Sequence, residues 1–172
     1  MSMLLHFTML SDESDGFLRE YEVPYDFSMF DLHCFICSDL KHDPNNMCSF
    51  FTADGHWEKG QEFTAFDVGN DYSDFGAEAP LPMEKVLLGK VARQKRDRLI
   101  YVFDPLNDRA LFLEVMGARK CNDECRPRVV SAKGEAPDPF EPGMVESASI
   151  FEDAMDEFSS FEGEGDAYDD DF

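Results

Sequence analysis

The segment LIYVFDPLNDRALFLEVM, residues 99–116, decides the fold class. Both of its halves, LIYVFD and RALFLEVM, are rich in aliphatic, β-branched and aromatic residues, which favour strands. The PLND between them is typical of a turn, because proline restricts the backbone and Asn and Asp side chains bond to it locally. Two β-prone runs around a short turn predict an antiparallel hairpin.

Two further strands are predicted at the start of the chain. Residues 4–10 are mostly apolar, and residues 17–23 alternate apolar and charged side chains, as a half-buried strand does. The SDESDG between them is typical of a turn. The span from Ser11 to Glu22 also loosely resembles a calcium loop, but its first position is a serine and its flanks favour strands. The sequence therefore predicts an opening hairpin.

Two helices are predicted in the middle of the domain. Ser28 is a suitable N-cap, and Asp31 follows it at the spacing of a capping box. Apolar residues then recur at helical spacing, and Pro44 lies beyond the end of this helix because proline cannot continue it. Residues 82–95 predict a second helix that begins at a proline. Gly89 weakens that helix by about 1 kcal/mol relative to alanine.

The predicted elements combine into an α+β fold. Their order is β-β-α-β-β-α-β-β, with the third and fourth strands at residues 48–53 and 63–66. This order predicts a mostly antiparallel sheet with the two helices packed on one face. The first seven elements also suit a β-grasp-like sheet.

The charge distribution predicts a folded domain followed by an acidic tail. The chain has 172 residues and a formal charge of -22. Residues 1–140 carry 25 acidic and 15 basic side chains, whereas residues 141–172 carry 12 acidic and no basic ones. The prolines of APDPFEPG mark the boundary. We therefore predict a domain over residues 1–138, long enough to bury a core, and a largely disordered tail over 139–172.

The tail is expected to contain a short amphipathic helix near residues 147–159. Phe151, Ala154, Met155 and Phe158 recur at helical spacing, with acidic residues between them. Two turns are too few for a helix that is stable alone, so this segment is expected to fold when it docks. The expected target is an unknown protein partner or the basic part of its own domain, where the tail would compete with an anionic ligand.

The composition excludes several classes of protein. A pI near 4.3 argues against a general nucleic-acid coat protein, and 43% hydrophobic residues argue against a wholly disordered chain. No apolar run approaches the roughly 18 residues that a membrane helix needs. The N-terminal MSMLLHFTMLSDESDG contains no basic leader. We therefore expect a cytoplasmic protein that does not bind a membrane.

The five cysteines raise a thiol or zinc hypothesis. An odd number without a leader predicts reduced thiols. Cys34 and Cys37 form a CxxC after His33, but they lie in mid-helix, whereas a redox motif begins a helix. Buried structural thiols are the plainer interpretation. The alternative is a zinc site that pairs them with Cys121 and Cys125, although C-x3-C spacing is less typical of zinc.

The turn DGHWEKGQE, residues 54–62, holds the single tryptophan of the chain. His56, Trp57 and Glu58 form an aromatic and polar cluster that is a candidate for lining a site. The alternative is that this tryptophan covers one edge of the core.

Basic residues are concentrated in one part of the chain. Of the 15 lysines and arginines, 12 fall in residues 85–133. Such a patch can bind phosphates despite the acidic charge of the whole chain. The alternative is a solvated helix face balanced by neighbouring acids. The candidate nucleic-acid-binding residues are Lys90, Arg93, Lys95, Arg96 and Arg98.

Common catalytic motifs are missing from the sequence. It contains no GxGxxG, GxxxxGK[ST], HExxH or GxSxG, and no serine stands in a recognisable nucleophile setting. No catalytic residue and no cofactor is therefore predicted, and enzymatic activity has little support.

Three stretches carry a family resemblance: DGHWEKGQEFT, LIYVFDPLNDRALFLEV and SAKGEAPDPF. They resemble the plasmid pRi ORF-three-like family, which also occurs as the "TnpR" passenger of an insertion sequence. The resemblance spans residues 1–140 and implies an α+β domain of uncharacterised function in a prokaryote. The matching hairpin residues are Tyr101, Phe103, Asp104, Leu113 and Glu114. Looser matches are Asp31, Leu32 and His33, and later Gly134, Ala136, Pro137 and Asp138.

The chain also departs from the usual form of that family. The usual Gly-Asp-x-Trp-x-His continuation of the hairpin is replaced by PLNDR at residues 105–109, so no role of that Trp or His is transferred. The resolvase-like name is not supported, because a serine recombinase needs a serine among arginines near its N-terminus and only Arg19 lies nearby.

These observations predict a non-enzymatic interaction module that contacts a protein partner through its acidic tail and is linked to mobile genetic elements by the resemblance. The first alternative is a nucleic-acid-associated accessory protein whose basic helix is masked by the tail. A second alternative is a zinc or thiol protein that uses Cys34 and Cys37.

Overall fold

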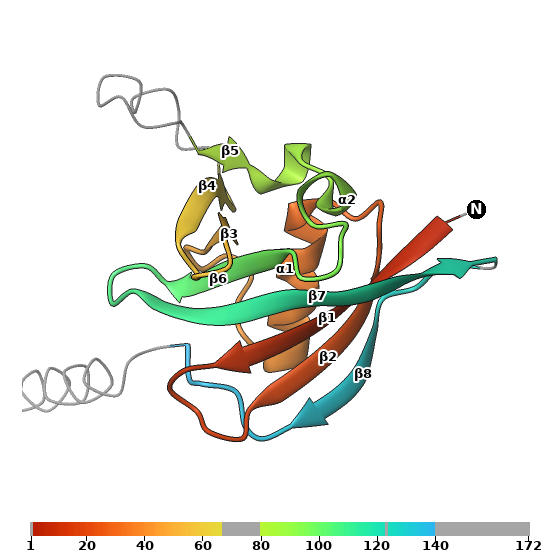
Figure 1. Ribbon diagram of the computed structural model, residues 1–172. Helices are drawn as coiled ribbons and strands as arrows, with labels where there is room; N and C mark the ends of the chain where they lie inside the picture. The colour runs from red at the N-terminus through yellow and green to blue at the C-terminus, as the bar shows by residue number, and fades with distance from the viewer. Residues whose placement is uncertain (1, 67–79, 123, 140–172) are drawn as a thin grey trace, which may run out of the picture. The chain divides into compact units, whose positions relative to one another are not determined.

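An eight-stranded sheet is the framework of the structure, a computed structural model that describes residues 2–66, 80–122 and 124–139 (Figure 1). The chain divides into units at residues 1–137 and 138–172, and the sheet belongs to the first. The strands lie in the order β5-β4-β3-β6-β7-β1-β2-β8. Their bounds are β1 Ser2–Ser11, β2 Leu18–Pro24, β3 Ser49–Ala53, β4 Lys59–Thr64, β5 Leu81–Pro82, β6 Arg98–Asp104, β7 Arg109–Cys121 and β8 Arg128–Lys133.

The two predicted hairpins form the centre of this sheet. β6 pairs with β7, and β1 pairs with β2, both antiparallel. β7 also pairs with β1 over nearly the whole length of β1, which joins the hairpins into one sheet. Only the short β4–β5 pair is parallel among the described strands. The prediction of a mixed α+β fold with a mostly antiparallel sheet is therefore confirmed.

Helix α1, Met29–Leu40, covers one face of the sheet, behind β6, β7, β1 and β2 in Figure 1. The predicted capping box is present. The Asp31 amide donates to the Ser28 hydroxyl at 3.0 Å, and the Ser28 amide donates to the Asp31 carboxylate at 3.0 Å. The helix ends at Leu40, because the next residue, Lys41, has a left-handed φ of 61° that stops the helical path before Pro44. Leu32 and Ile36 of α1 are fully buried in the main core.

The prediction of a second helix over residues 82–95 is wrong. The segment forms a 3₁₀ turn at Met83–Lys85, then two extended residues, then the single turn α2 at Leu88–Val91. Tertiary hydrogen bonds explain the break. The Val86 carbonyl accepts from the Met29 amide at 2.8 Å, and the Leu88 amide donates to the Phe27 carbonyl at 2.7 Å. The segment thus serves as a backbone partner for the entry to α1.

Replacing Gly89 with alanine is expected to destabilise the protein by about 1–3 kcal/mol, although helix propensity alone predicts a gain. A Cβ at this position would lie 2.1 Å from the ring of Tyr25. Urea unfolding measures the effect. Gly55→Ala is the control, because a Cβ there meets no atom within 4 Å. A Gly89→Ala variant more stable than wild type would contradict this packing.

The predicted element order also needs correction. The structure adds β5 beside β4 and β8 beside β2, and the strand expected at residues 63–66 is instead β4, Lys59–Thr64. The 11–16 segment is a turn, as expected of the opening hairpin. Within it the Ser11 hydroxyl accepts hydrogen bonds from the Glu13 and Ser14 amides. Ser11, the last residue of β1, thus uses its hydroxyl to hold a hairpin turn, which is the alternative to a calcium loop.

Two further expectations concern membranes and the tail. In the part of the chain that the structure describes, no helix is both long and apolar enough to cross a bilayer. The helix expected near residues 147–159 lies outside the described residues.

Candidate functional site

The CxxC segment lies in the middle of α1, as the sequence predicted. His33 and Cys37 are fully buried and face the sheet, whereas Cys34 is half-buried. The hydroxyl of Tyr101, on β6, reaches both of the buried side chains. It lies 2.8 Å from His33 Nδ1 and 3.3 Å from Cys37 Sγ. The structure therefore joins a helix residue pair to the predicted hairpin through one buried polar cluster.

The hydrogen bonds of this cluster determine which atoms carry protons. His33 Nε2 lies 2.8 Å from the carbonyl of Pro44, which can only accept, so Nε2 carries the proton. His33 Nδ1 then accepts from the Tyr101 hydroxyl, and that hydroxyl can accept from the Cys37 thiol. Each buried polar group thus has a partner, which is what the low dielectric of a core demands.

Burial keeps each member of the cluster neutral. It lowers the pKa of His33 despite the hydrogen bond to the Pro44 carbonyl, and it raises the pKa of Cys37 to about 11. Burial also raises the pKa of Tyr101. A nucleophilic thiol must be a thiolate, and metal ligation also needs the thiolate form. The cluster therefore connects α1 to β6 as a structural element.

The lowered pKa of His33 predicts a pH dependence of stability. Below the ordinary pKa near 6.5, the unfolded chain binds a proton that the folded chain does not. Stability attributable to His33 is therefore present above pH 6.5 and falls as the pH drops, by at most about 1.4 kcal/mol for each pH unit. Urea unfolding between pH 5 and 8 measures this slope. His33→Gln should lose it, and an unchanged slope in that variant would refute the assignment.

The four-cysteine zinc hypothesis is not supported by the arrangement of these residues. Cys121 and Cys125 form a disulfide at the end of β7, so the expectation of reduced thiols is wrong for this pair. Their Cα atoms are 6.0 Å apart, a separation that a disulfide can span. Cys34 and Cys37 remain free on α1. Within residues 2–66, 80–122 and 124–139, no three His, Cys, Asp or Glu residues are arranged to hold a metal ion.

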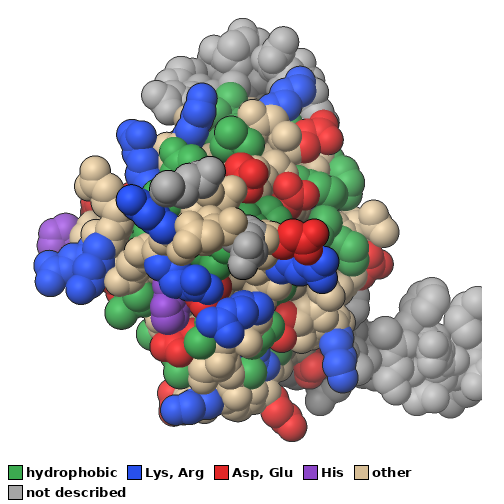
Figure 2. Space-filling view, turned by 90° about the vertical axis from the view of Figure 1, so that its right-hand side faces the viewer, with side chains coloured by type: hydrophobic (Ala, Val, Ile, Leu, Met, Phe, Trp, Pro, Cys, Tyr) green, Lys and Arg blue, Asp and Glu red, His purple; other side chains and the backbone are tan. Residues whose placement is uncertain are grey.

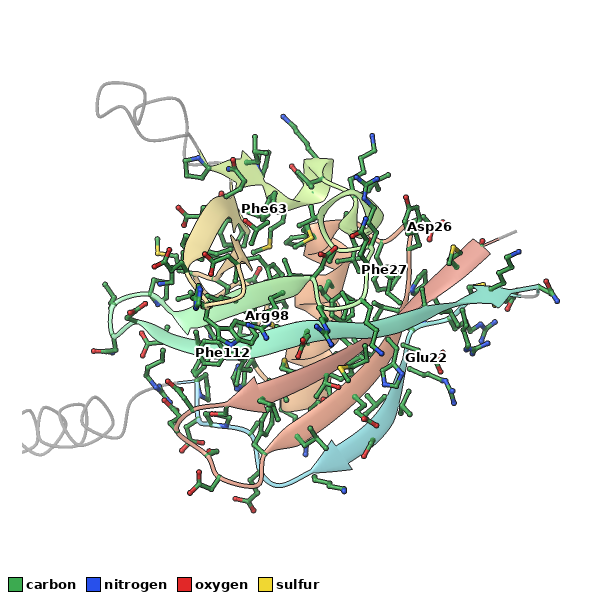
Figure 3. All side chains as sticks on the ribbon, viewed as in Figure 1. Glu22, Asp26, Phe27, Phe63, Arg98 and Phe112 are labelled. Atoms are coloured by element: carbon green, nitrogen blue, oxygen red, sulfur yellow. A yellow bond between two sulfur atoms is a disulfide. The ribbon has the colours of Figure 1, made fainter. Side chains whose placement is uncertain are left out.

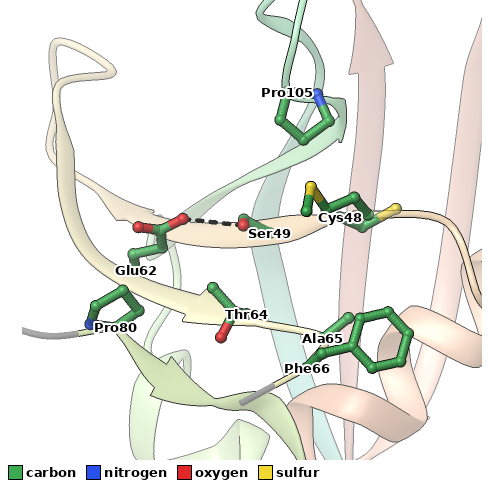
Figure 4. Close-up of a pocket in the computed structure, with 9 residues that line it drawn as sticks. Cys48, Ser49, Glu62, Thr64, Ala65, Phe66, Pro80 and Pro105 are labelled. Atoms are coloured by element: carbon green, nitrogen blue, oxygen red, sulfur yellow. Dashed lines mark hydrogen bonds between the residues drawn. The ribbon is translucent and has the colours of Figure 1, made fainter. Parts of the chain in front are cut away.

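A pocket of about 180 Å³ opens beside Cys48 (Figure 4). Its lining is mostly apolar, and its Ser49 hydroxyl donates to the Glu62 carboxylate at 2.9 Å. Burial raises the pKa of the Cys48 thiol, opposed by a hydrogen bond with Tyr101, so this cysteine is not poised to react. The remaining lining residues are Met47, Thr64, Ala65, Phe66, Pro80 and Pro105.

The turn that holds Trp57 covers a second, smaller hydrophobic cluster on the other face of the sheet. Trp57 packs on Phe112 with ring centroids 5.2 Å apart, over a cluster that includes Ile100 and Val102. The guanidinium of Arg98 lies 4.6 Å from the centre of the Trp57 ring. His56 and Glu58 are exposed on either side of it. The structure therefore favours the interpretation of Trp57 as a cover for a core edge.

The hairpin residues that carry the family resemblance have mainly structural contacts. Asp104 is buried at the end of β6 and accepts hydrogen bonds from Asn107 at 3.0 Å and Arg109 at 3.4 Å. Arg109 also stacks over the ring of Phe103, 4.9 Å from its centre. Glu114 pairs with Arg98 at 3.7 Å. These contacts close the hairpin and attach its tip to the first turn through the Arg109–Glu13 ion pair.

The candidate nucleic-acid-binding residues do not share a helix face. Lys90 lies on α2, Arg98 begins β6, and the remaining three belong to the tight turn at residues 93–97. Asp97 holds this turn closed, because its carboxylate accepts from the Arg93 and Gln94 amides at 3.0 Å each. The Arg96 amide donates to the Val115 carbonyl at 2.8 Å, which attaches the turn to β7.

Most of these cations have no acidic partner in the described part of the chain. Arg98 is neutralised by Glu114 and bonded to the Gly55 carbonyl. We call Lys90, Arg93, Lys95 and Arg96 the basic turn; all four side chains are exposed, and no ion pair joins any of them to a described residue. Figure 2 views the side of the molecule where α2 and the ends of β1 and β7 lie, and Lys and Arg side chains are spread over it with acidic ones among them.

The partners that complete these arrangements were not predicted from the sequence. Neither the Tyr101 hydroxyl nor the Pro44 carbonyl was expected to bond to His33. The only sequence signal was the alternation of β6, which places Tyr101 on the core face with Leu99 and Phe103. Nothing local indicated which helix residue would meet it.

Comparisons with known proteins bear on the fold only. No protein-family model matches the chain, and no curated protein does. A solved structure described as a protein of unknown function, MM3350 from Methanosarcina mazei Go1, is similar at a TM-score of 0.62 and 16% identity. The match covers 80% of this chain and 74% of that one. The chain therefore shares the fold of an uncharacterised archaeal protein, and this similarity assigns neither a family nor an activity.

Proposed function

We propose that this protein is a non-enzymatic interaction module that binds partners through charged surfaces. Within the described residues, its binding element is the basic turn. The acidic segment 141–172 is its element for a protein partner. The link to mobile genetic elements rests on the family resemblance of the β6–β7 hairpin. The observation that carries the proposal is the exposure of four cations without an acidic partner among the described residues.

The chemistry of the buried residues supports a role without catalysis. The side chains best suited to acid–base or nucleophilic chemistry are those of His33, Cys37 and Tyr101. They form hydrogen bonds with one another and with the backbone. Their pKa shifts all favour the neutral forms. A catalytic group is normally exposed to its substrate and has a pKa tuned toward the working pH. These groups instead hold α1 against the sheet.

The shape of the basic turn supports binding to a polyanion. The backbone of residues 93–97 is held by two hydrogen bonds that the Asp97 carboxylate accepts and by two bonds with Val115 of β7, so little ordering is needed on binding. Lysine and arginine side chains on a rigid turn can contact several phosphates or carboxylates at once. Side chains that already form ion pairs, such as Arg98, contribute less to the binding of a polyanion.

Nucleic-acid binding by the basic turn is the second candidate function. The observation that favours it is again the charge of Lys90, Arg93, Lys95 and Arg96, which no described acid neutralises, on a protein that is otherwise strongly acidic. Phosphate contacts of this kind release counterions, so the affinity must fall with salt.

The test is binding of the labelled full chain to duplex DNA, single-stranded RNA and polyglutamate across a salt series. A triple variant, Arg93→Gln with Lys95→Gln and Arg96→Gln, should weaken binding. For duplex DNA it should also reduce the salt slope by about 0.9 for each phosphate that the variant no longer neutralises. The matched control, Lys41→Gln with Arg126→Gln and Lys133→Gln, changes the net charge equally and should bind like wild type.

The three probes separate the outcomes. Preference for polyglutamate supports an acidic protein partner, and preference for DNA or RNA supports the nucleic-acid function. Equal weakening by the triple variant and its control would show that only net charge matters and would refute a site at the basic turn.

A further inference from the structure

A second cavity, of about 200 Å³, opens where β1, β2 and β7 meet. It lies on the face of the sheet opposite α1, because side chains alternate along a strand and Leu5 and Phe7 of β1 face the α1 core. Figure 3 shows Glu22, one of its lining residues, near the end of the sheet where β1 begins and β7 ends. The lining residues are Leu4, His6, Glu22, Gly117, Ala118 and Arg119.

A β-bulge and a glycine create this space. His6 pairs with Gly117, but the next residue, Phe7, pairs with Val115, so Met116 is an extra residue in β7. A Cβ on Gly117 would meet no atom within 4 Å. The cavity is therefore the volume that a side chain opposite His6 would otherwise fill.

His6, one of the residues that line the cavity, has a buried polar atom that lacks a partner. His6 Nε2 is inaccessible and has no hydrogen bond, and it is the one such side-chain atom in the described residues. Buried polar atoms are nearly always hydrogen-bonded, so an exception calls for an occupant that supplies the bond. Neutral histidine can donate from Nε2, as His33 does to a carbonyl in the core.

The charges around the cavity favour an anion. Glu22 is only 5% exposed, and Arg119 Nε donates to one of its oxygens at 2.5 Å. Arg128 Nε donates to the other oxygen at 2.9 Å. One buried carboxylate thus faces two guanidinium groups, and the side chains of Arg119 and Arg128 remain 56% and 59% exposed. Glu20, the next residue of β2 on this face, does not line the cavity.

We propose that this cavity binds a small oxyanion, a phosphate or carboxylate group, with Arg119 as one hydrogen-bond donor and His6 as the other, its ring turning so that Nε2 reaches the ligand. Glu22 would hold Arg119 in position through Nε and leave its two terminal NH₂ groups for the ligand. The volume equals that of six or seven waters at about 30 Å³ each, which suits one such group and a few attached atoms. The site uses none of the residues of the basic turn and does not depend on the proposed function.

The test follows the His6 ring by NMR on the full chain at constant pH and ionic strength. Inorganic phosphate and sodium acetate are titrated separately, with sodium chloride as the reference salt, and His6→Gln assigns the resonance. Saturable movement of the His6 signal with phosphate, acetate or both supports the site and identifies the group that it prefers. Movement that is the same for all three salts, or no movement, would overturn it.

Variants distinguish this site from general attraction of anions. Arg119→Gln should weaken binding at least tenfold, whereas Arg126→Gln, with the same change of charge on an exposed arginine, should leave it unchanged. Gly117→Val should abolish binding by filling the cavity while the amide spectrum stays folded, because valine suits a strand. Equal weakening by Arg126→Gln, or full binding by Gly117→Val, would refute the cavity as the site.

Discussion

Replacing Tyr101 with alanine is expected to lower the free energy of unfolding by about 3–5 kcal/mol. Tyr101 is fully buried, and its ring packs against Phe50 with centroids 4.8 Å apart. The change removes that packing and leaves a cavity between β6 and α1. It also removes the hydroxyl that serves His33 and Cys37. Urea unfolding followed by circular dichroism measures the loss.

Tyr101→Phe separates the contribution of the hydroxyl to stability from that of the ring. It keeps the packing but leaves His33 Nδ1 without its donor, so the expected cost is about 1–3 kcal/mol. Tyr25→Phe is the control, because Tyr25 is 37% exposed and its loss of a hydroxyl should change stability by less than about 0.5 kcal/mol. If Tyr101→Phe is as stable as wild type, the buried hydrogen bonds of the cluster do not contribute to the fold.

Replacing Asp39 with alanine is expected to lower the free energy of unfolding by about 3 kcal/mol. The change breaks a largely buried ion pair and leaves Arg19 without its acidic partner. Asp39 Oδ2 accepts from Arg19 Nε at 3.1 Å and from the Tyr21 hydroxyl at 2.7 Å. Arg19 is 9% exposed and would keep only its bonds to the carbonyls of Leu18, Lys133 and Gly134. The ion pair thus attaches α1 to β2 and to the end of β8.

Thermal or urea unfolding of Asp39→Ala tests this attachment. Asp26→Ala is the control, because Asp26 is exposed and no ion pair or hydrogen bond of its side chain is described; its effect should stay within about 0.5 kcal/mol. Asp39→Asn keeps an acceptor without the charge and should fall between wild type and Asp39→Ala. Equal stability of Asp39→Ala and Asp26→Ala would contradict the ion pair.

The elements predicted correctly depend on neighbours in the sequence. Ser28 and Asp31 cap α1 through bonds that span three residues, so their spacing alone was sufficient. The β6–β7 and β1–β2 hairpins likewise follow from strand propensity on both sides of short turns. In each case the interactions that form the element lie within a single short segment of the chain.

The second helix was mispredicted because its backbone bonds go elsewhere. Residues 82–95 have helical composition, but Val86 and Leu88 use their backbone groups on Met29 and Phe27. Gly89 is required by the ring of Tyr25 and not by the helix. The basic residues therefore appear on a turn and not along one helix face, which no local pattern indicated.

The candidate sites also differ in whether the local sequence or only the tertiary structure reveals them. The composition of residues 85–133 identified the basic region, and the exposure of Lys90, Arg93, Lys95 and Arg96 agrees with a surface role. The cavity beside His6 was not predictable, because it requires a bulge that pairs His6 with Gly117 and brings Glu22 to Arg119. These residues are separated by up to 113 positions in the chain.

By itself the sequence determined the α+β class, both hairpins, the capped first helix and the acidic character of residues 141–172. Only the tertiary structure decided the strand order, the break in the second helix, the Cys121–Cys125 disulfide and the partners of His33, Arg19 and Glu22. The physical reason is the distance along the chain over which each kind of interaction acts. Propensity, capping and turn chemistry act over a few residues, whereas burial and pairing act between segments that meet only in the folded chain.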